Sequence, residues 1–391
     1  MSISIEELNS MNPDSYQIID IRDEAEIGHG AIPGAVAVAT EEIEGNEKID
    51  FSKKLVICCS RGKYSVDVAE ELSEKGIDAE SLEGGYIAWL IDNMKQKEAA
   101  EKAGEGSFAK DVEQSLRKKF RKSIWCKFTK AINEYELVKP GDKIAVCISG
   151  GKDSMLMAKL FQELKRHNKF DFEVKFLVMD PGYSPANRQV IEENAKRLEI
   201  PIEIFESDIF ESVYNVEKSP CYLCARMRRG YLYSHAQKMG CNKIALGHHY
   251  DDVIETILMG MLYSAQFQTM MPKLHSTNFE GMELIRPMYL IKESAIKAWR
   301  DTNGLHFIQC ACRFTENCVS CGGGSGSKRD EMKELVAQFR NTSSVIETNI
   351  FNSVRDINLR TVMGYHKDGE YYNFLDDYDQ RGNKGADKEK E

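Results

Sequence analysis

The sequence predicts an α/β protein, with a small α/β domain followed by a larger parallel sheet that carries helices on both faces. The length of 391 residues suits two or three domains. Strand-like and helical stretches alternate through most of the chain, which is typical of parallel sheets. Hydrophobic residues make up 42% and charged residues 29% of the sequence, an ordinary balance for a protein with a buried core.

The first domain shows short β-rich runs at Tyr16–Ile21 and Lys54–Ile57 and a helical stretch at Ser65–Lys75. The stretch after it is rich in Lys, Glu, Ala and Gly and has little to bury, as linkers do. The end of the chain is polar, charged and without periodicity. We therefore expect a first domain at residues 1–94, a linker at 95–115, a second domain at 116–375 and a disordered tail at 376–391.

The second domain opens with the basic segment Leu116–Tyr135, whose apolar residues recur at helical spacing. We expect a helix docked by its apolar face, and its lysines and arginines could also contact phosphates. Strands and helices then alternate. The expected strands are Lys143–Ile148, Phe172–Met179 and Lys243–Leu246, and the expected helices are Ser154–Arg166, Pro185–Leu198 and Asp252–Met261.

A glycine turn, Ser-Gly-Gly-Lys-Asp-Ser, joins the first of these strands to its helix. Glycines let backbone N–H groups approach an anion, and the helix start adds its positive dipole end. The spacing differs from a Walker loop. The hexapeptide resembles the PP-loop of ATP-pyrophosphatases, which cleave ATP between the α and β phosphates, although a plain strand–turn–helix corner is the alternative. The ATP-binding residues that the resemblance implies are Ser149, Gly150, Gly151, Lys152, Asp153 and Ser154.

A second segment, Ala245–Thr256, also lies where a strand ends and a helix opens. Asp251 and Asp252 could hold Mg²⁺, which prefers carboxylates and substrate phosphates. His248 or His249 could contact phosphate or the activated base. The alternative is an acidic helix start that only complements the dipole.

Two further aspartates belong to this expected site. Asp180 ends a strand where the nucleoside would be read, although an Asp before Pro-Gly is also common turn chemistry. Asp153 and Asp252 are the carboxylates that we expect the adenylation step to need.

Six cysteines are clustered in the second domain. Cys221 and Cys224 form a C-x-x-C pair, and the others are Cys310, Cys312, Cys318 and Cys321. Two thiolates at the C-x-x-C spacing can share one metal centre. The arginines that follow the pair would stabilise thiolates and could bind RNA phosphates; they are Arg226, Arg228 and Arg229.

From about Lys118 to Asn358 the sequence resembles the tRNA 2-thiocytidine synthetase family. The resemblance is carried by the glycine turn, the arginine-rich C-x-x-C, the Ala-Leu-Gly-His-His-x-Asp-Asp stretch and Leu284–Pro287. It implies a 4Fe–4S cluster bound by Cys221, Cys224 and a third cysteine. Cys310 matches the third position best, with Cys312 and Cys318 as rivals; a zinc site formed by Cys221, Cys224, Cys318 and Cys321 is the alternative.

The first domain resembles the rhodanese family through Ile19–Arg22, Gly30–Ala35, Cys58–Ser65 and Leu82–Trp89. The resemblance implies that Cys59 carries transferable sulfur as a persulfide, in a loop whose N–H groups favour an anion. Cys58 is expected to be a packing residue. Tyr64 replaces the arginine that the family has at the end of this loop.

Together these features predict an ATP-dependent tRNA sulfurtransferase that adenylates the C2 oxygen of a cytidine and replaces it by sulfur. We expect this sulfur to come from the rhodanese persulfide by way of the iron–sulfur cluster. The alternatives are the same chemistry on a tRNA uridine or a small metabolite, and a non-catalytic ATP- and redox-sensing iron–sulfur protein. The net charge of −10 argues against a general nucleic-acid coat, so RNA contacts would be local. The start of the chain lacks a signal peptide and no apolar run approaches about 20 residues, so we expect a cytoplasmic protein without membrane contact. The expected cofactors are ATP, Mg²⁺ and the cluster, and the expected partners are tRNA, a cysteine desulfurase or other persulfide donor, and a second copy in a homodimer.

Overall fold

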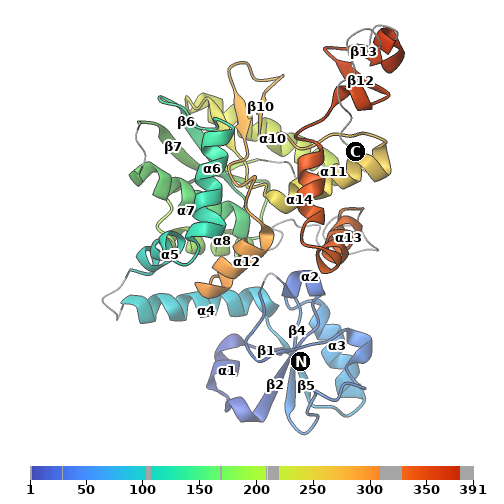
Figure 1. The fold of residues 1–391 in the computed structure, drawn as a ribbon. Coiled ribbons are helices and arrows are strands. Elements are labelled where there is room, and N and C mark those ends of the chain that lie inside the picture. The colour runs from blue at the N-terminus through green and yellow to red at the C-terminus, as the bar shows by residue number, and fades with distance from the viewer. Residues whose placement is uncertain are drawn as a thin grey trace. The chain divides into compact units, whose positions relative to one another are not determined.

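The computed structural model describes residues 2–28, 30–102, 107–167, 170–207, 209, 220–308 and 328–378 (Figure 1). Its contacts divide the chain into two compact units. Unit 1 comprises Met1–Asp252 and Met271–Lys328, and unit 2 comprises Val253–Met270 and Arg329–Glu391. The part of the chain that the structure describes contains no helix long and apolar enough to cross a bilayer.

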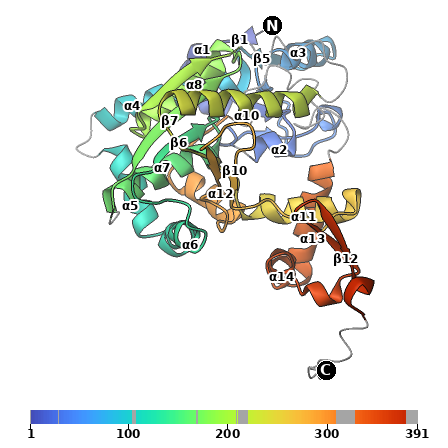
Figure 2. The same ribbon diagram turned by 90° about the horizontal axis from the view of Figure 1, so that it is seen from above.

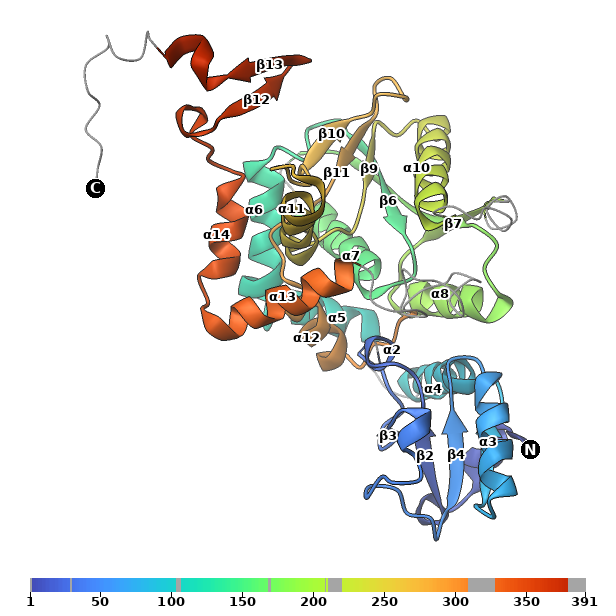
Figure 3. The same ribbon diagram turned by 90° about the vertical axis from the view of Figure 1, so that its right-hand side faces the viewer.

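Unit 1 begins with a five-stranded parallel sheet in the order β1-β5-β4-β2-β3, and Figure 3 shows α3 beside this sheet. Its strands are β1 (Ser2–Ile3), β2 (Tyr16–Asp20), β3 (Val36–Ala37), β4 (Lys54–Cys58) and β5 (Ala79–Leu82). Its helices are α1 (Ile5–Ser10), η1 (Pro13–Ser15), α2 (Glu24–Ile27), η2 (Thr40–Glu42), α3 (Tyr64–Glu74) and α4 (Gly85–Lys102). The central strand β4 is buried on both faces because Val56 packs with Leu90 of α4, while Ile57 packs with Val68 of α3.

The expected linker, residues 95–115, contains two helical stretches in its described part. Residues 95–102 continue α4, and residues 108–115 belong to α5 (Phe108–Arg117). The polar composition of this stretch suggested a linker with little to bury. A narrow apolar stripe on α5, which includes Val112 and Leu116, is nevertheless buried.

The basic segment is not one helix. After α5 the chain makes a π-helical turn, η3 (Arg121–Trp125), and continues as α6 (Cys126–Glu134). The expected apolar face is nevertheless confirmed, since Phe120, Ile124, Phe128 and Ile132 are all buried.

A six-stranded sheet in the order β10-β11-β9-β6-β7-β8 forms the second half of unit 1. Its strands are β6 (Lys143–Ile148), β7 (Glu173–Asp180), β8 (Ile202–Glu206), β9 (Lys243–Ala245), β10 (Lys273–His275) and β11 (Glu283–Ile285). All neighbours pair in parallel except β10 and β11, an antiparallel edge that the sequence pattern did not predict.

Helices cover both faces of this sheet, as predicted. The helices are α7 (Lys152–His167), α8 (Pro185–Arg197), α10 (Pro220–Lys238) and α12 (Glu293–Thr302). One face, which includes Val146 and Val178, packs against α5, α6, α7, α8 and α12. The other face, which includes Cys147 and Leu177, packs against α10 (Figure 2).

Unit 2 begins within α11 (Tyr250–Ser264), at Val253, and resumes at Arg329, the second residue of α13 (Lys328–Thr342). It continues with α14 (Ile346–Ser353) and η4 (Leu359–Thr361). It ends in the hairpin β12 (Gly364–Lys367) and β13 (Glu370–Asn373) and in η5 (Phe374–Asp377). Of the expected tail, residues 376–378 are described, and they belong to η5 and its cap. The rest of the tail lies outside the described residues.

Candidate active site

The glycine turn Ser149–Ser154 connects the end of β6 to the start of α7. Gly150 has φ +87°, and a Cβ placed on it would lie 2.5 Å from Ile191 Cγ1, so only glycine fits. Ser149 N donates to Ser154 Oγ (3.2 Å), and that hydroxyl donates to Gly151 O (3.0 Å). These bonds hold the turn closed at a helix N-terminus, the arrangement that suits a phosphate.

The second predicted segment meets this turn directly. A Cβ on Gly247 would lie 3.4 Å from Asp153 C and from Ser154 N, so the two backbones are in contact. The buried side chain of His249 lies with Nε2 3.8 Å from Asp153 Oδ1. The structure therefore brings together the two sequence motifs that carried the ATP-site prediction.

Asp251 and Asp252 both hold helix starts in this structure. Asp252 Oδ2 accepts from His249 N (2.8 Å) at the start of α11, and Asp251 Oδ2 accepts from Glu293 N (2.7 Å) at the start of α12. Asp251 and Asp252 therefore also act as acidic residues that complement the dipole of a helix start, the alternative stated for this segment. The described residues contain no group of three or more His, Cys, Asp or Glu side chains arranged for a metal.

The His248 and His249 side chains differ in burial. His248 is half-buried, whereas His249 is buried with Nδ1 3.4 Å from Asp252 Oδ2 and 3.8 Å from Asp251 Oδ2. His249 therefore lies among three carboxylates, counting that of Asp153.

Glu293 is a site residue that the sequence analysis missed. Its Oε1 lies 3.0 Å from Lys152 Nζ, which is also 3.1 Å from Asp153 Oδ2, and Lys152 is only 4% exposed. Burial acts to raise the pKa of Glu293, but the charges of Lys152 and Lys297 outweigh it and lower that pKa to about 2. Burial acts to lower the pKa of Lys152, and the neighbouring Asp153 and Glu293 carboxylates outweigh it, so that the pKa is raised. The feature of the sequence that could have indicated Glu293 is that it is an acidic residue at the start of the helix after Leu284–Pro287.

Asp180, at the end of β7, is engaged in its own turn. Its Oδ1 accepts from Gly182 N (2.8 Å) and Tyr183 N (2.6 Å), while Oδ2 lies 3.2 Å from Arg188 Nη1. The structure therefore shows the turn chemistry that was left open as the alternative.

The C-x-x-C pair lies in the first turns of α10, and the side chains of Cys221 and Cys224 lie outside the described residues. Positions three apart on a helix share a face, so the spacing fits two thiolates on one centre. Leu223 and Met227 of the same turns pack with Met179, at the end of β7. Because β6 and β7 are adjacent and parallel, α10 starts at the edge of the sheet that carries the glycine turn.

The three arginines behind the pair are described. Arg228 Nη2 donates to Tyr183 Oη (3.3 Å), and Arg226 and Arg229 are exposed. Cys310, Cys312, Cys318 and Cys321 lie outside the described residues. The chain reaches them through Ile308, whose Cδ1 would lie 2.9 Å from a Cβ on Gly150.

The predicted sulfur-carrying cysteine, Cys59, lies in the loop between β4 and α3 and is buried. Its Sγ accepts from Gly62 N (3.1 Å) and Ser65 N (3.4 Å) and lies 3.1 Å from Ser65 Oγ. Donors directed at one sulfur atom favour an anionic thiolate or persulfide.

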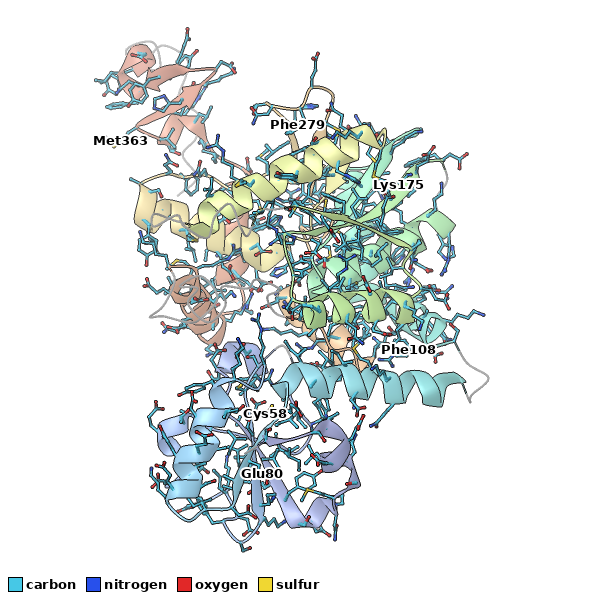
Figure 4. The ribbon with its side chains drawn as sticks, turned by 180° about the vertical axis from the view of Figure 1, so that it is seen from behind. Cys58, Glu80, Phe108, Lys175, Phe279 and Met363 are labelled. Carbon is cyan, nitrogen blue, oxygen red and sulfur yellow. The ribbon has the colours of Figure 1, made fainter. Side chains whose placement is uncertain are left out.

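The neighbouring Cys58 is a fully buried packing residue, as expected, and Figure 4 shows it next to α4. Burial raises the pKa of its thiol well above the usual range. Cys147 and Cys241 are also buried, and Cys126 is half-buried. These four thiols occupy positions suited to small apolar side chains.

Comparisons with known proteins identify both halves of the chain. A family model described as a rhodanese-like domain matches residues 4–92, and one described as a PP-loop domain matches residues 121–313. A tRNA-cytidine(32) 2-sulfurtransferase of Syntrophotalea carbinolica is 32% identical over 64% of this chain and 94% of that protein. A protein of the same name from Acaryochloris marina is 35% identical over 59% of this chain and 79% of its own length. Among solved structures, the U34-tRNA thiolase NcsA from Methanococcus maripaludis with its 4Fe–4S cluster is 19% identical, covers 59% of this chain and 76% of its own, and has a TM-score of 0.46.

Proposed function

The chain belongs to the family of tRNA-cytidine(32) 2-sulfurtransferases, and from this premise we propose that it replaces the C2 oxygen of a tRNA cytidine by sulfur in an ATP-dependent reaction. The resemblance stated from the sequence motifs is thereby confirmed at the level of the family. We assign sulfur carriage to residues 1–94 and thiolation to residues 116–375, which contain the two matched regions. The observation that carries the proposal is the direct contact between the glycine turn and the His-His-x-Asp-Asp segment.

The first chemical step is adenylation. The C2 oxygen attacks the α-phosphate of ATP, and pyrophosphate leaves. The C2 oxygen by itself is a poor leaving group, and after this step it can leave as part of AMP, which is a good one. The amides of Ser149–Ser154 bind phosphate oxygens, and Lys152 neutralises their charge. Asp251 and Asp252 would hold Mg²⁺ through their carboxylates, with Asp153 and His249 beside them, and the ion would neutralise phosphate charge.

The second step brings in sulfur. The terminal sulfur of a Cys59 persulfide attacks C2, AMP departs with the former C2 oxygen, and a C2–S–S–Cys59 disulfide results. Two thiols of an external reductant then supply two electrons, cleave this S–S bond, and leave 2-thiocytidine and the Cys59 thiol. A cysteine desulfurase or another persulfide donor reloads Cys59.

The spacing of Cys221 and Cys224 in the first turns of α10 fits a 4Fe–4S cluster, because soft thiolates one helical turn apart are typical cluster ligands. Cys221, Cys224 and Cys310 would hold it. The chemistry that it would supply is an open iron with affinity for sulfur.

Recognition of tRNA falls to the arginines of α10. Arg226 and Arg229 are exposed and available for phosphate contacts, while Arg228 is held by Tyr183. The target base must lie in a loop or leave its stack, since C2 is not accessible in a paired and stacked base.

Mass spectrometry of nucleosides from tRNA tests the proposal in cells with and without the gene. Loss of 2-thiocytidine, restored by the native gene and by Asp171→Asn but not by Asp252→Asn, is the expected result; Asp171 is exposed in the same domain. Loss of a thiouridine instead would move the target to uridine. Unchanged nucleosides together with no ATP–pyrophosphate exchange would favour the non-catalytic sensor. Iron content and broad visible absorbance distinguish a cluster from zinc.

A further inference from the structure

The loop that carries Cys59 is held between two helices of its own domain. On one side, Tyr86 N donates to Cys59 O (2.9 Å) and Ile87 N donates to Ser60 O (3.2 Å), so the first turn of α4 is bonded to the loop. On the other side, Ser60 Oγ donates to Glu26 Oε1 of α2 (2.7 Å). A surface that holds α2 and α4 in place therefore also holds the loop and the Cys59 sulfur atom in place.

Both helices contact the same short segment of the thiolation domain, residues 300–308. Arg300 is buried, and its Nη1 donates to Gly28 O (2.7 Å) at the C-terminal end of α2. The rings of Trp89, on α4, and His306 meet edge to face with centroids 5.8 Å apart. A buried guanidinium on a carbonyl and an aromatic contact are both of the kind that fixes an interface.

The far end of this segment contacts the nucleotide site. Asn194 Nδ2, on α8, donates to His306 O (2.9 Å), and Ile308 packs beside Gly150 of the glycine turn. Helix α4 also contacts α8, and Met94 belongs to the same buried cluster as Ile191 and Ile308. Nine consecutive residues thus connect the sulfur-carrying loop to the ATP-binding loop within unit 1.

We propose that residues 300–308 are a docking surface whose partner is the rhodanese-like domain of the same chain, so that Cys59 delivers sulfur within one chain. The inference rests on the function proposed above. Covalent attachment with a fixed interface replaces a bimolecular encounter by an intramolecular one with an effective concentration in the millimolar range or higher. A free persulfide protein at micromolar concentration could not match that supply.

The first experiment compares two sulfur sources in the full-length enzyme with cluster. Thiolation of tRNA is measured with a persulfide donor that loads Cys59, and separately with inorganic sulfide. Arg300→Met and Trp89→Leu remove the two contacts, and Arg355→Met is the matched control at an exposed arginine after α14. We expect the persulfide-supported rate to fall roughly tenfold or more in both variants while the sulfide-supported rate is unchanged.

The docking inference would be overturned if the thiolation rate of the variants fell equally with the persulfide donor and with sulfide. It would also be overturned if neither rate fell. Failure of the native enzyme to thiolate tRNA with either source would instead contradict the proposed function. The two failures are therefore distinguishable in one set of assays.

The second experiment asks whether delivery crosses between chains. A Cys59→Ser chain and an Asp252→Asn chain are mixed and supplied with the persulfide donor. Delivery within one chain predicts that the mixture stays below roughly a tenth of the native rate. Recovery of about a quarter or more would show delivery between chains and overturn the proposal.

Discussion

Replacing Glu293 by glutamine tests the ion pair that holds the lysine of the nucleotide loop. The change keeps the shape of the side chain and removes the charge 3.0 Å from Lys152 Nζ. At that distance an effective dielectric constant of about 20 gives an attraction of about 5.5 kcal/mol, before the opposing effect of burial. A pKa lowered from 4.5 to about 2 corresponds to a net stabilisation of about 3 kcal/mol at neutral pH.

The sign of the pH dependence follows from the lowered pKa of Glu293. A carboxyl group of lowered pKa stabilises the fold fully above its unfolded pKa of 4.5, and this contribution is lost as the pH falls towards 2. Glu293→Gln should therefore cost about 3 kcal/mol at pH 7 and about 1 kcal/mol at pH 3.

Guanidinium unfolding followed by tryptophan fluorescence measures the loss. Trp299 is fully buried in α12, the helix that Glu293 begins, and so reports on the relevant transition. Glu280→Gln, an exposed change in the same unit, should stay within about 0.5 kcal/mol of the native chain. The reasoning is refuted if Glu293→Gln loses no more than that control at pH 7, or if its loss does not shrink at pH 3.

Three other outcomes are expected. Gly150→Ala should weaken ATP binding at least tenfold by calorimetry, because the new Cβ meets Ile191 at a φ of +87°; unchanged affinity would show that the loop tolerates the strain. Ser65→Ala should slow alkylation of Cys59 several-fold, since Ser65 Oγ lies 3.1 Å from the Cys59 sulfur. An unchanged rate would show that the backbone amides alone stabilise the thiolate. Removal of iron with a chelator under oxidising conditions, followed by reduction and reloading of Cys59, should abolish thiolation while ATP–pyrophosphate exchange continues, because the open iron with affinity for sulfur is lost; thiolation that persists without iron would exclude a role for the cluster in sulfur transfer.

Local patterns were sufficient to predict most of the fold. The strands and helices around the glycine turn were placed to within a few residues because each is marked by an apolar run and a turn signal. The antiparallel pair of β10 and β11 was not predicted, since its partners depend on contacts between distant segments. The hairpin of β12 and β13 was missed too, although Asp368 and Gly369, both at positive φ, are a recognisable turn signal.

The candidate site was predictable where chemistry follows a contiguous motif. Ser149–Ser154 and Gly247–Asp252 meet as expected, because both end neighbouring parallel strands. Glu293 was not found, since a single acidic residue at a helix start has no signature of its own. Asp180 ends β7 where it was expected, and its hydrogen bonds show the turn, whereas its contact with the nucleoside stays a prediction.

Helix α12 has a consequence for how this protein tolerates insertions and deletions. Glu293, the partner of Lys152, and Arg300, the residue that contacts Gly28, are seven positions apart on it. Seven residues make about two turns and a rise of about 10 Å, so both side chains project from nearly the same stripe of the helix. Adding or removing one residue between them would turn Arg300 by about 100° away from its carbonyl while Lys152 kept its partner. The length of α12 between these two residues is therefore fixed, and gain or loss of a single codon there would keep the Glu293–Lys152 pair but displace Arg300 and the contact with the sulfur carrier.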